Sequence, residues 1–242
     1  MYDFERVEAS YEFLSCVTYT DCHKSNFRKI EHMKAECADG SYVFTMLGST
    51  EESVDGIVPE GWGEIILKFG KALYPISLKV NESGEVFGIN EFEKFKEQWM
   101  TRRREIVESY ENNFFIKKES YRYALALKTE EKFIDILRRN MFYCLLLWQD
   151  VASEHKVEIR DFPASGRLAI FTFNDKKYDD NGGVSYETGQ VNDEGSGRLL
   201  SGQAKLQIYR DKDGLPKEIK LKARVEEAET GYFTKEITIK RL

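Results

Sequence analysis

The order in which two hydrophobic periodicities follow one another is the feature that most constrains this chain. Apolar and polar residues alternate, as in β-strands, over residues 5–89 and again over residues 156–242. Between them, apolar residues recur every three or four positions, as in amphipathic helices, over residues 90–111 and 129–150. Because strands and helices are segregated, parallel βαβ units are disfavoured. We predict a single α+β domain over residues 1–242, in which an antiparallel sheet or half-barrel of N- and C-terminal strands packs around two long amphipathic helices.

The first strand region divides at polar turns. Its alternating segments are residues 11–19, 27–35, 42–47, 65–69, 75–80 and 85–89. Residues 48–63 are rich in Gly, Ser, Asp and Glu and contain Pro59, so we expect a loop there. Gly84 offers the positive φ angle that a hairpin turn requires.

The two helical segments carry apolar stripes and capping residues. Asn90 and Thr129 are suitable N-caps, and glutamates follow each of them, where negative charge stabilises a helix. The stripe of the first helix consists of Phe92, Phe95, Trp99, Ile106 and Tyr110. That of the second consists of Phe133, Leu137, Met141, Cys144 and Trp148, widened by Ile134, Leu145 and Leu147. Such a wide stripe implies burial on more than one side, so we expect the sheet to wrap the second helix. Residues 112–116 are predicted to break the helical region.

The second strand region contains one long polar interruption. Alternation predicts strands at residues 156–159, 167–173, 203–209, 217–225 and 233–242, each with one buried and one wet face. Residues 174–202 are rich in glycine and acidic residues, and we expect a mobile segment or a binding loop there. Its acidic residues include Asp175, Asp179, Asp180, Asp193 and Glu194.

Charge and composition restrict the partners and the compartment. The formal net charge is −6 and the pI is about 5.4, which favours cationic partners over nucleic acid. The basic run at residues 102–104 lies among glutamates on a predicted helix and is expected to be a solvated face. The longest apolar run, residues 141–148, is too short to span a membrane. We expect a cytoplasmic protein whose four cysteines are reduced.

Several residues have the chemistry of metal ligands or catalysts, but their spacing does not support a site. Cys16, Cys22, His23, His32 and Cys37 are thiol and imidazole ligands, yet no pair has zinc-knuckle spacing and strands would point them to different faces. Cys22 and His23 are adjacent, so on a strand they would lie on opposite sides. Residues 195–202 lack both the dinucleotide and the P-loop glycine patterns. We predict no catalytic residues, no metal and no cofactor.

Two segments resemble known proteins. Residues 78–99, a hairpin that runs directly into a capped helix, resemble a segment of uncharacterised bacterial α+β proteins. Residues 206–242, with their Asp-Gly-Leu-Pro turn, are similar to the last strands of half-barrel folds of the lipoprotein-carrier type. The resemblance implies an architecture and carries no catalytic motif.

The functional expectation rests on the acidic balance and on the polar segment 174–202. We expect a non-enzymatic binding protein, an immunity or adaptor protein that binds a toxin or secreted partner by charge complementarity. Trp62, between two glycines, is either a core plug or an exposed contact residue. The expected partner-binding residues are Trp62, Asp175, Asp179, Asp180, Asp193 and Glu194. The alternative is a carrier that holds a small apolar ligand in a half-barrel cavity lined by Phe and Tyr. An enzyme ranks third, and neither nucleic acid nor a membrane is an expected partner.

Overall fold

A computed structural model describes residues 2–38, 41–111, 113–149, 155–163, 167–173, 175–179, 182–189, 191–193, 199–228 and 230–242. The helices are α1 (Trp62–Lys71), α2 (Phe92–Ser109), α3 (Phe114–Ala126), α4 (Glu130–Arg138) and α5 (Met141–Leu146). The strands of the large sheet are β1 (Arg6–Thr18), β2 (Lys24–Ala38), β3 (Ser41–Val54), β4 (Ile76–Val80), β5 (Val86–Ile89), β8 (Asp175–Tyr178), β9 (Val184–Thr188), β11 (Leu199–Arg210), β12 (Pro216–Glu227) and β13 (Gly231–Arg241). A small sheet contains β6 (Lys156–Arg160), β7 (Leu168–Thr172) and β10 (Asn192–Asp193).

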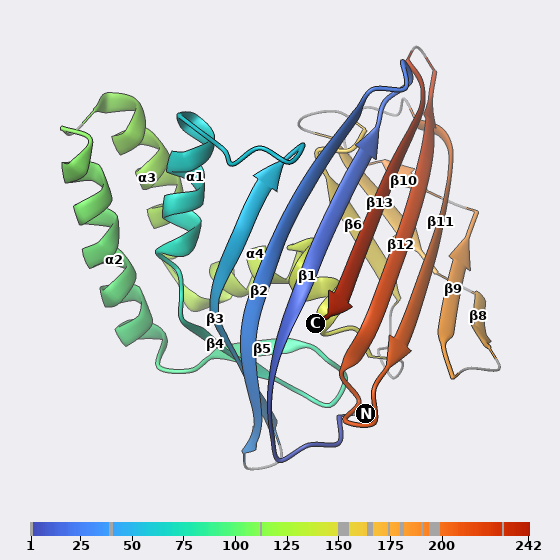
Figure 1. Cartoon of the computed structure of the whole chain (residues 1–242), viewed down its shortest axis with the longest axis horizontal. Helices are drawn as coiled ribbons and strands as arrows, with labels where there is room; N and C mark the ends of the chain where they lie inside the picture. The colour runs from blue at the N-terminus through green and yellow to red at the C-terminus, as the bar shows by residue number, and fades with distance from the viewer. Residues whose placement is uncertain are drawn as a thin grey trace.

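The large sheet is antiparallel, open and built from both ends of the chain (Figure 1). Its ten strands follow the order β5-β4-β3-β2-β1-β13-β12-β11-β9-β8. The two ends of the chain meet where β1 pairs with β13, with Tyr11 opposite Arg241 and Thr18 opposite Thr234. The predicted α+β class and the sheet of N- and C-terminal strands are therefore confirmed.

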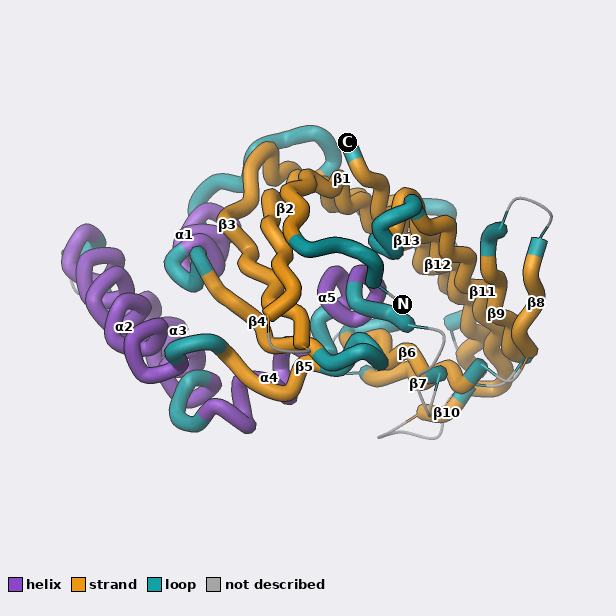
Figure 2. Tube along the Cα trace, turned by 90° about the horizontal axis from the view of Figure 1, so that it is seen from below, coloured by secondary structure: helices purple, strands orange, loops and turns teal. Residues whose placement is uncertain are grey.

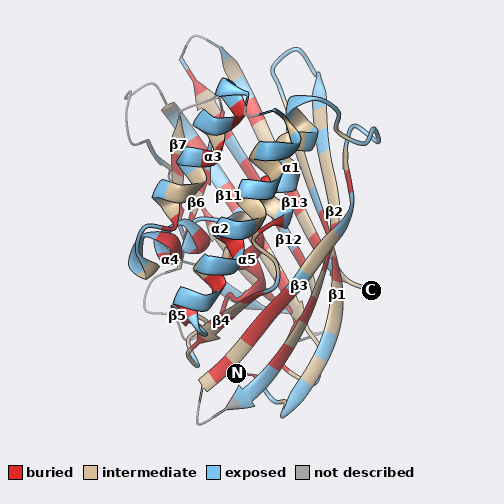
Figure 3. Ribbon diagram, turned by 90° about the vertical axis from the view of Figure 1, so that its left-hand side faces the viewer, coloured by how far each residue is buried: buried red, intermediate tan, exposed pale blue. Residues whose placement is uncertain are grey.

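The element that the sheet wraps is the short helix α5. Figure 2 shows α5 inside the curve of the large sheet, with β6 and β7 on its other side. Its Phe142, Tyr143, Leu145 and Leu146 are buried and belong to the hydrophobic core. Helix α2, by contrast, lies on one flank, and its outward residues are exposed (Figure 3). The part of the helical region that the sheet wraps is thus α5, whereas α2 buries the Phe92, Phe95 and Trp99 side of its predicted stripe and exposes the other side.

The predicted helix over residues 129–150 is interrupted at Asn140. Thr129 caps α4 as expected, its hydroxyl accepting a hydrogen bond from the Lys132 backbone N–H. At Asn140 the backbone is extended, and the side-chain oxygen accepts from the N–H of Phe142 at 3.0 Å. An asparagine side chain that caps a new helix competes with continuation of the old one. The apolar stripe therefore continues through a change of direction that its periodicity does not reveal.

Three further expectations from the sequence were wrong. Residues 65–69, predicted as a strand, belong to α1, where Glu64 and Lys68 form an ion pair one helical turn apart. A short apolar run fits a buried helix as well as a strand, so periodicity cannot separate them. The break predicted at residues 112–116 does separate α2 from α3, but its predicted end is wrong, because Asn113 caps α3 and Phe114–Ile116 are helical. Asn90, expected to cap α2, is not its cap residue, because that position belongs to Glu91.

Both predicted loops contain strands. Strand β3 runs through residues 48–54, and the register shift between His32 and Met33 of β2 lies opposite Gly48, so a β-bulge lets pairing continue through a glycine-containing segment. In the region 174–202, β8 and β9 pair antiparallel and extend the large sheet to its edge. Polar, glycine-rich composition fits an exposed edge strand as well as a loop, which is why composition misled the prediction.

Candidate functional site

A pocket of about 530 Å³ lies between the large sheet and helices α1, α3 and α4. This volume is within the range of small-molecule sites, roughly 300–1,000 Å³. Its apolar walls include Phe27 of β2, Ile66 and Leu67 of α1, Tyr123 of α3 and Phe133 of α4. Elements from four parts of the chain thus supply one mostly apolar lining.

A buried ion pair lies beside this pocket on β2. Lys29 and Glu31 are two residues apart on a strand, so their side chains point to the same face. Glu31 is 0% exposed, and its Oε1 accepts hydrogen bonds from the Lys29 ammonium and, at 2.6 Å, from the Tyr74 hydroxyl. The ammonium also lies 5.0 Å from the centroid of the Phe142 ring. Lys29 and Tyr74 line the pocket, so they add polar side chains to a lining that is otherwise mostly apolar.

Tyr74 and Tyr143, which both line the pocket, are hydrogen-bond donors rather than bases. Burial raises the pKa of Tyr74, and the neighbouring Tyr143 and the Glu31 carboxylate raise it further. Burial and the same carboxylate also raise the pKa of Tyr143. Both phenols therefore stay protonated at neutral pH, and neither can serve as a general base there.

The charged residues at the rim are paired with one another. Lys71 is 2.8 Å from Glu52, and the Ser49 hydroxyl donates a hydrogen bond of 2.5 Å to the same carboxylate. Burial opposes ionisation of Glu52, but the hydrogen bonds from Lys71 and Ser49 hold its pKa below the usual value. Arg122 pairs with Glu119 at 2.9 Å. Because the lining cations each have a carboxylate partner, the pocket is close to electrically balanced.

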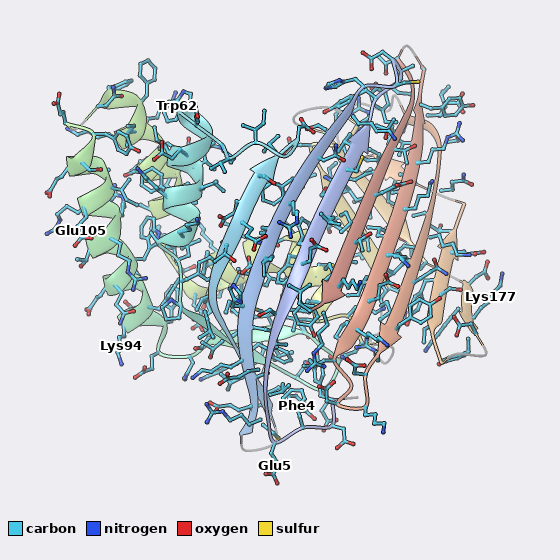
Figure 4. All side chains as sticks on the ribbon, viewed as in Figure 1. Phe4, Glu5, Trp62, Lys94, Glu105 and Lys177 are labelled. Atoms are coloured by element: carbon cyan, nitrogen blue, oxygen red, sulfur yellow. The ribbon has the colours of Figure 1, made fainter. Side chains whose placement is uncertain are left out.

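Trp62, one of the residues expected to bind a partner, is not a core plug. It is the first residue of α1 and is 50% exposed. Figure 4 shows Trp62 on the side of the molecule where the helices lie, and Lys177 of the edge strand β8 on the opposite side. The structure therefore places Trp62 far from Asp175, which also belongs to β8.

The structure does not bring the acidic residues of this set together. Asp175 is exposed on the edge strand β8, and the Asp179 carboxylate accepts a hydrogen bond of 2.8 Å from the Gly183 N–H within the following turn. Asp193 belongs to β10 of the small sheet. Asp180 and Glu194 lie outside the described residues. The described acidic residues thus lie on two different sheets, and whether they bind a partner stays a prediction.

The alternating and helical patterns of the sequence do not reveal where this pocket lies, although one signal for it is present. Lys29 and Glu31 stand at inward positions of the alternating segment 27–35, where an apolar residue is expected. Two charges on the buried side of a strand indicate a paired or functional cluster. The remaining walls come from helices whose mutual packing no local pattern specifies.

Among the described residues, no cluster of three or more His, Cys, Asp and Glu side chains is placed to hold a metal ion, and this includes the candidates between Cys16 and Cys37. Within the described ranges, none of the helices has the length and apolar character needed to cross a membrane. No model of a known protein family matches the chain, and no curated protein matches it.

Proposed function

We propose that this protein is a non-enzymatic binding protein that holds a small apolar ligand in the pocket between the large sheet and helices α1, α3 and α4. The observation that supports it is the pocket itself, about 530 Å³ with mostly apolar walls. Apolar surface gains free energy when it leaves water, at roughly 25 cal/mol per Å². A predominantly apolar ligand with a small hydrogen-bonding group fits this lining, since Tyr143 and Asn140 are among its residues.

A substitution at Gly70 tests this proposal. Gly70 lines the pocket within α1, and a Cβ added there meets no atom within 4 Å. Gly70→Leu should therefore fill the pocket without a backbone clash, and it removes a glycine that costs a helix about 1 kcal/mol. We expect the affinity for the neutral apolar dye Nile red, measured by fluorescence titration, to fall by about tenfold or more. Stability against urea should be unchanged or higher.

The matched control adds the same side chain outside the pocket. Thr101 is exposed on α2 and is not among the residues that line the pocket. Thr101→Leu should leave the dye affinity of the wild type intact. Equal binding by Gly70→Leu and wild type, or no saturable binding by the wild type, would contradict the proposal. Native mass spectrometry of freshly purified protein would show whether a cargo is retained.

A second candidate function, an immunity or adaptor protein, is favoured by exposed apolar side chains at one end of the helical layer. Trp62 begins α1, and Phe114 and Phe115 begin α3, which contacts α1. All three are at least 50% exposed. Exposed aromatic residues that lie near one another mark protein-binding surfaces. The cytoplasm is the compartment we propose, since the four cysteines are free thiols.

The adaptor proposal makes its own prediction. Trp62→Ser should abolish co-purification of a specific partner encoded by a neighbouring gene, because a partly exposed tryptophan at such a surface commonly contributes 2 kcal/mol or more, roughly thirtyfold in affinity. Tyr232→Ser, which removes an exposed aromatic side chain from β13, is the control and should leave co-purification intact. Retention of the partner by Trp62→Ser would argue against this surface.

A further inference from the structure

Five exposed apolar side chains lie where β3 ends and α1 begins. They are Val54, Ile57, Val58, Trp62 and Ile66, which together we call the apolar tip. Ile57 and Val58 are the most exposed of them, at 68% and 70%. Monomeric proteins rarely expose a large contiguous apolar surface unless it binds something.

The backbone brings the two halves of the apolar tip together. Trp62 and Ile66 lie one helical turn apart on α1, so they share a face of that helix. A Cβ added to Gly63 would lie 2.8 Å from the Cβ of Pro59, so the chain that follows Val58 packs against the first turn of α1. The apolar tip therefore extends without interruption from the end of β3 into α1 (Figure 1).

A tight turn holds the outermost part of the apolar tip in place. Val54 and Ile57 exchange two backbone hydrogen bonds of 2.9 Å each. Between them, Asp55 and Gly56 have φ angles of +52° and +79°, as a two-residue hairpin turn requires. Asp55 also joins the turn to β2, because its N–H donates to the Asn26 carbonyl oxygen and its carboxylate accepts from the Asn26 N–H, both at 2.7 Å. A side chain presented on such an ordered backbone loses less entropy on binding.

The charge around the apolar tip is negative. Residues 51–67 contain five acidic residues and neither Lys nor Arg. Three of the five are offset by cations from elsewhere, in the ion pairs Glu51–Arg28, Glu52–Lys71 and Glu64–Lys68. The other two, Asp55 and Glu60, form no ion pair among the described residues. These two carboxylates stand on either side of Ile57 and Val58 in the sequence.

Charge decides between two kinds of surface that the apolar tip could meet. A tryptophan beside aliphatic residues suits the interface of a membrane as well as a protein. Anionic lipids attract basic residues and repel carboxylates, whereas the basic side chains of a protein attract carboxylates. Asp55 and Glu60 therefore favour a basic protein segment over an anionic membrane.

We propose that the apolar tip binds an amphipathic segment of a partner protein, whose apolar residues cover the tip and whose Lys or Arg side chains face Asp55 and Glu60. This inference rests on the second candidate function, in which this end of the helical layer binds a protein, and it adds the docking residues and the chemistry of the partner. The apolar contact supplies affinity, and the carboxylates select basic partners over acidic ones. The ligand of the pocket plays no part in it.

The probe is a short fluorescein-labelled model peptide of leucine and lysine at helical spacing, and the measurement is a fluorescence anisotropy titration. We expect saturable binding to the wild-type protein that weakens as salt is added, because exposed charges are screened. The matched peptide with glutamate in place of lysine should bind about tenfold more weakly or less.

A double variant tests the apolar contact. Ile57→Ser combined with Val58→Ser should weaken binding of the leucine–lysine peptide by about tenfold or more, because it removes the two most exposed side chains of the apolar tip. Leu200→Ser is the matched control, since Leu200 is 64% exposed on β11 of the large sheet. The control should bind the peptide like the wild type. Ile66 is left unchanged because it also lines the pocket.

A single variant tests the charge. Glu60→Gln should weaken binding of the leucine–lysine peptide by about threefold, the usual size of an exposed ion pair. Glu5 is also exposed and forms no ion pair among the described residues, and it lies at the other end of the molecule from Trp62 (Figure 4). Glu5→Gln should leave the affinity unchanged.

Three results would overturn the inference: no saturable binding of the leucine–lysine peptide, equal affinity for the two peptides, or wild-type affinity in the double variant. Sedimentation of the wild type with vesicles of phosphatidylcholine and phosphatidylglycerol, without peptide binding, would assign the apolar tip to a membrane instead.

Failure of this inference is distinguishable from failure of the proposed functions. If neither peptide binds but Trp62→Ser still loses its co-purifying partner, the adaptor function stands and only the basic partner is wrong. Nile red should bind the double variant as it binds the wild type, so the test of the pocket is independent of this one.

Discussion

Replacing Lys29 by methionine is expected to lower the free energy of unfolding by about 3–5 kcal/mol, the usual cost of breaking a buried ion pair from one side. The substitution leaves the fully buried Glu31 carboxylate without its cation, with only the Tyr74 hydroxyl as a donor to Oε1. A second oxygen, Oε2, has no hydrogen-bond partner among the described residues even in the wild type. Urea denaturation followed by circular dichroism at neutral pH measures the loss.

Two controls separate the buried charge from the loss of a lysine. Adding Glu31→Gln to Lys29→Met removes the charge yet keeps an acceptor for Tyr74, so most of the stability should return. Lys205→Met breaks an exposed ion pair with Glu187 and should cost less than about 1 kcal/mol. If Lys29→Met is as stable as Lys205→Met, the Lys29–Glu31 pair beside the pocket is not a buried ion pair of the kind described above.

Gly84→Ala, in the turn between β4 and β5, is expected to lower the free energy of unfolding strongly. Gly84 has a φ of +79°, where residues with a side chain pay roughly 1–2 kcal/mol. A Cβ there would lie 1.9 Å from the carbonyl oxygen of Leu147, which is backbone and cannot rotate away. The turn must therefore separate from the end of α5, and we expect a loss of about 3 kcal/mol or more in thermal or urea unfolding.

Gly56 provides the matched control, because it has the same φ of +79° and a Cβ added there meets nothing within 4 Å. Gly56→Ala should show only the backbone cost, about 1 kcal/mol. An equal loss in the two variants would mean that the turn does not pack closely against Leu147.

The sequence predicted the strands best where alternation is long. The alternating segment 217–225 lies within β12, which pairs with β11 and β13 along its two edges. Its residues are buried and exposed in alternation, so one face of the strand lies against the core and the other faces water. The turn at Gly84 was also predicted, and its φ is positive. Such features depend on neighbouring residues alone, so a single sequence contains the information.

Prediction failed where a short segment fits two structures. The apolar run of α1 satisfies a strand or a helix, and in the structure it is a helix whose buried Phe69 stacks on Tyr123 of α3. The interruption at Asn140 likewise depends on a cap that competes with helix continuation. The partner-binding set from the sequence remains untested, and its described members do not lie together.

The sequence by itself determined the α+β class, the positions of most strands and the antiparallel pairing, because alternation and turn residues act over a few positions. Only the tertiary structure decided that β1 and β13 join the two ends, that α5 rather than a long helix fills the curve, and that a pocket forms between the large sheet and helices α1, α3 and α4. The physical reason is that a pocket is the space left when segments distant in sequence pack. Tyr74 reaches Glu31, and Gly84 lies against Leu147, only because such distant segments pack together.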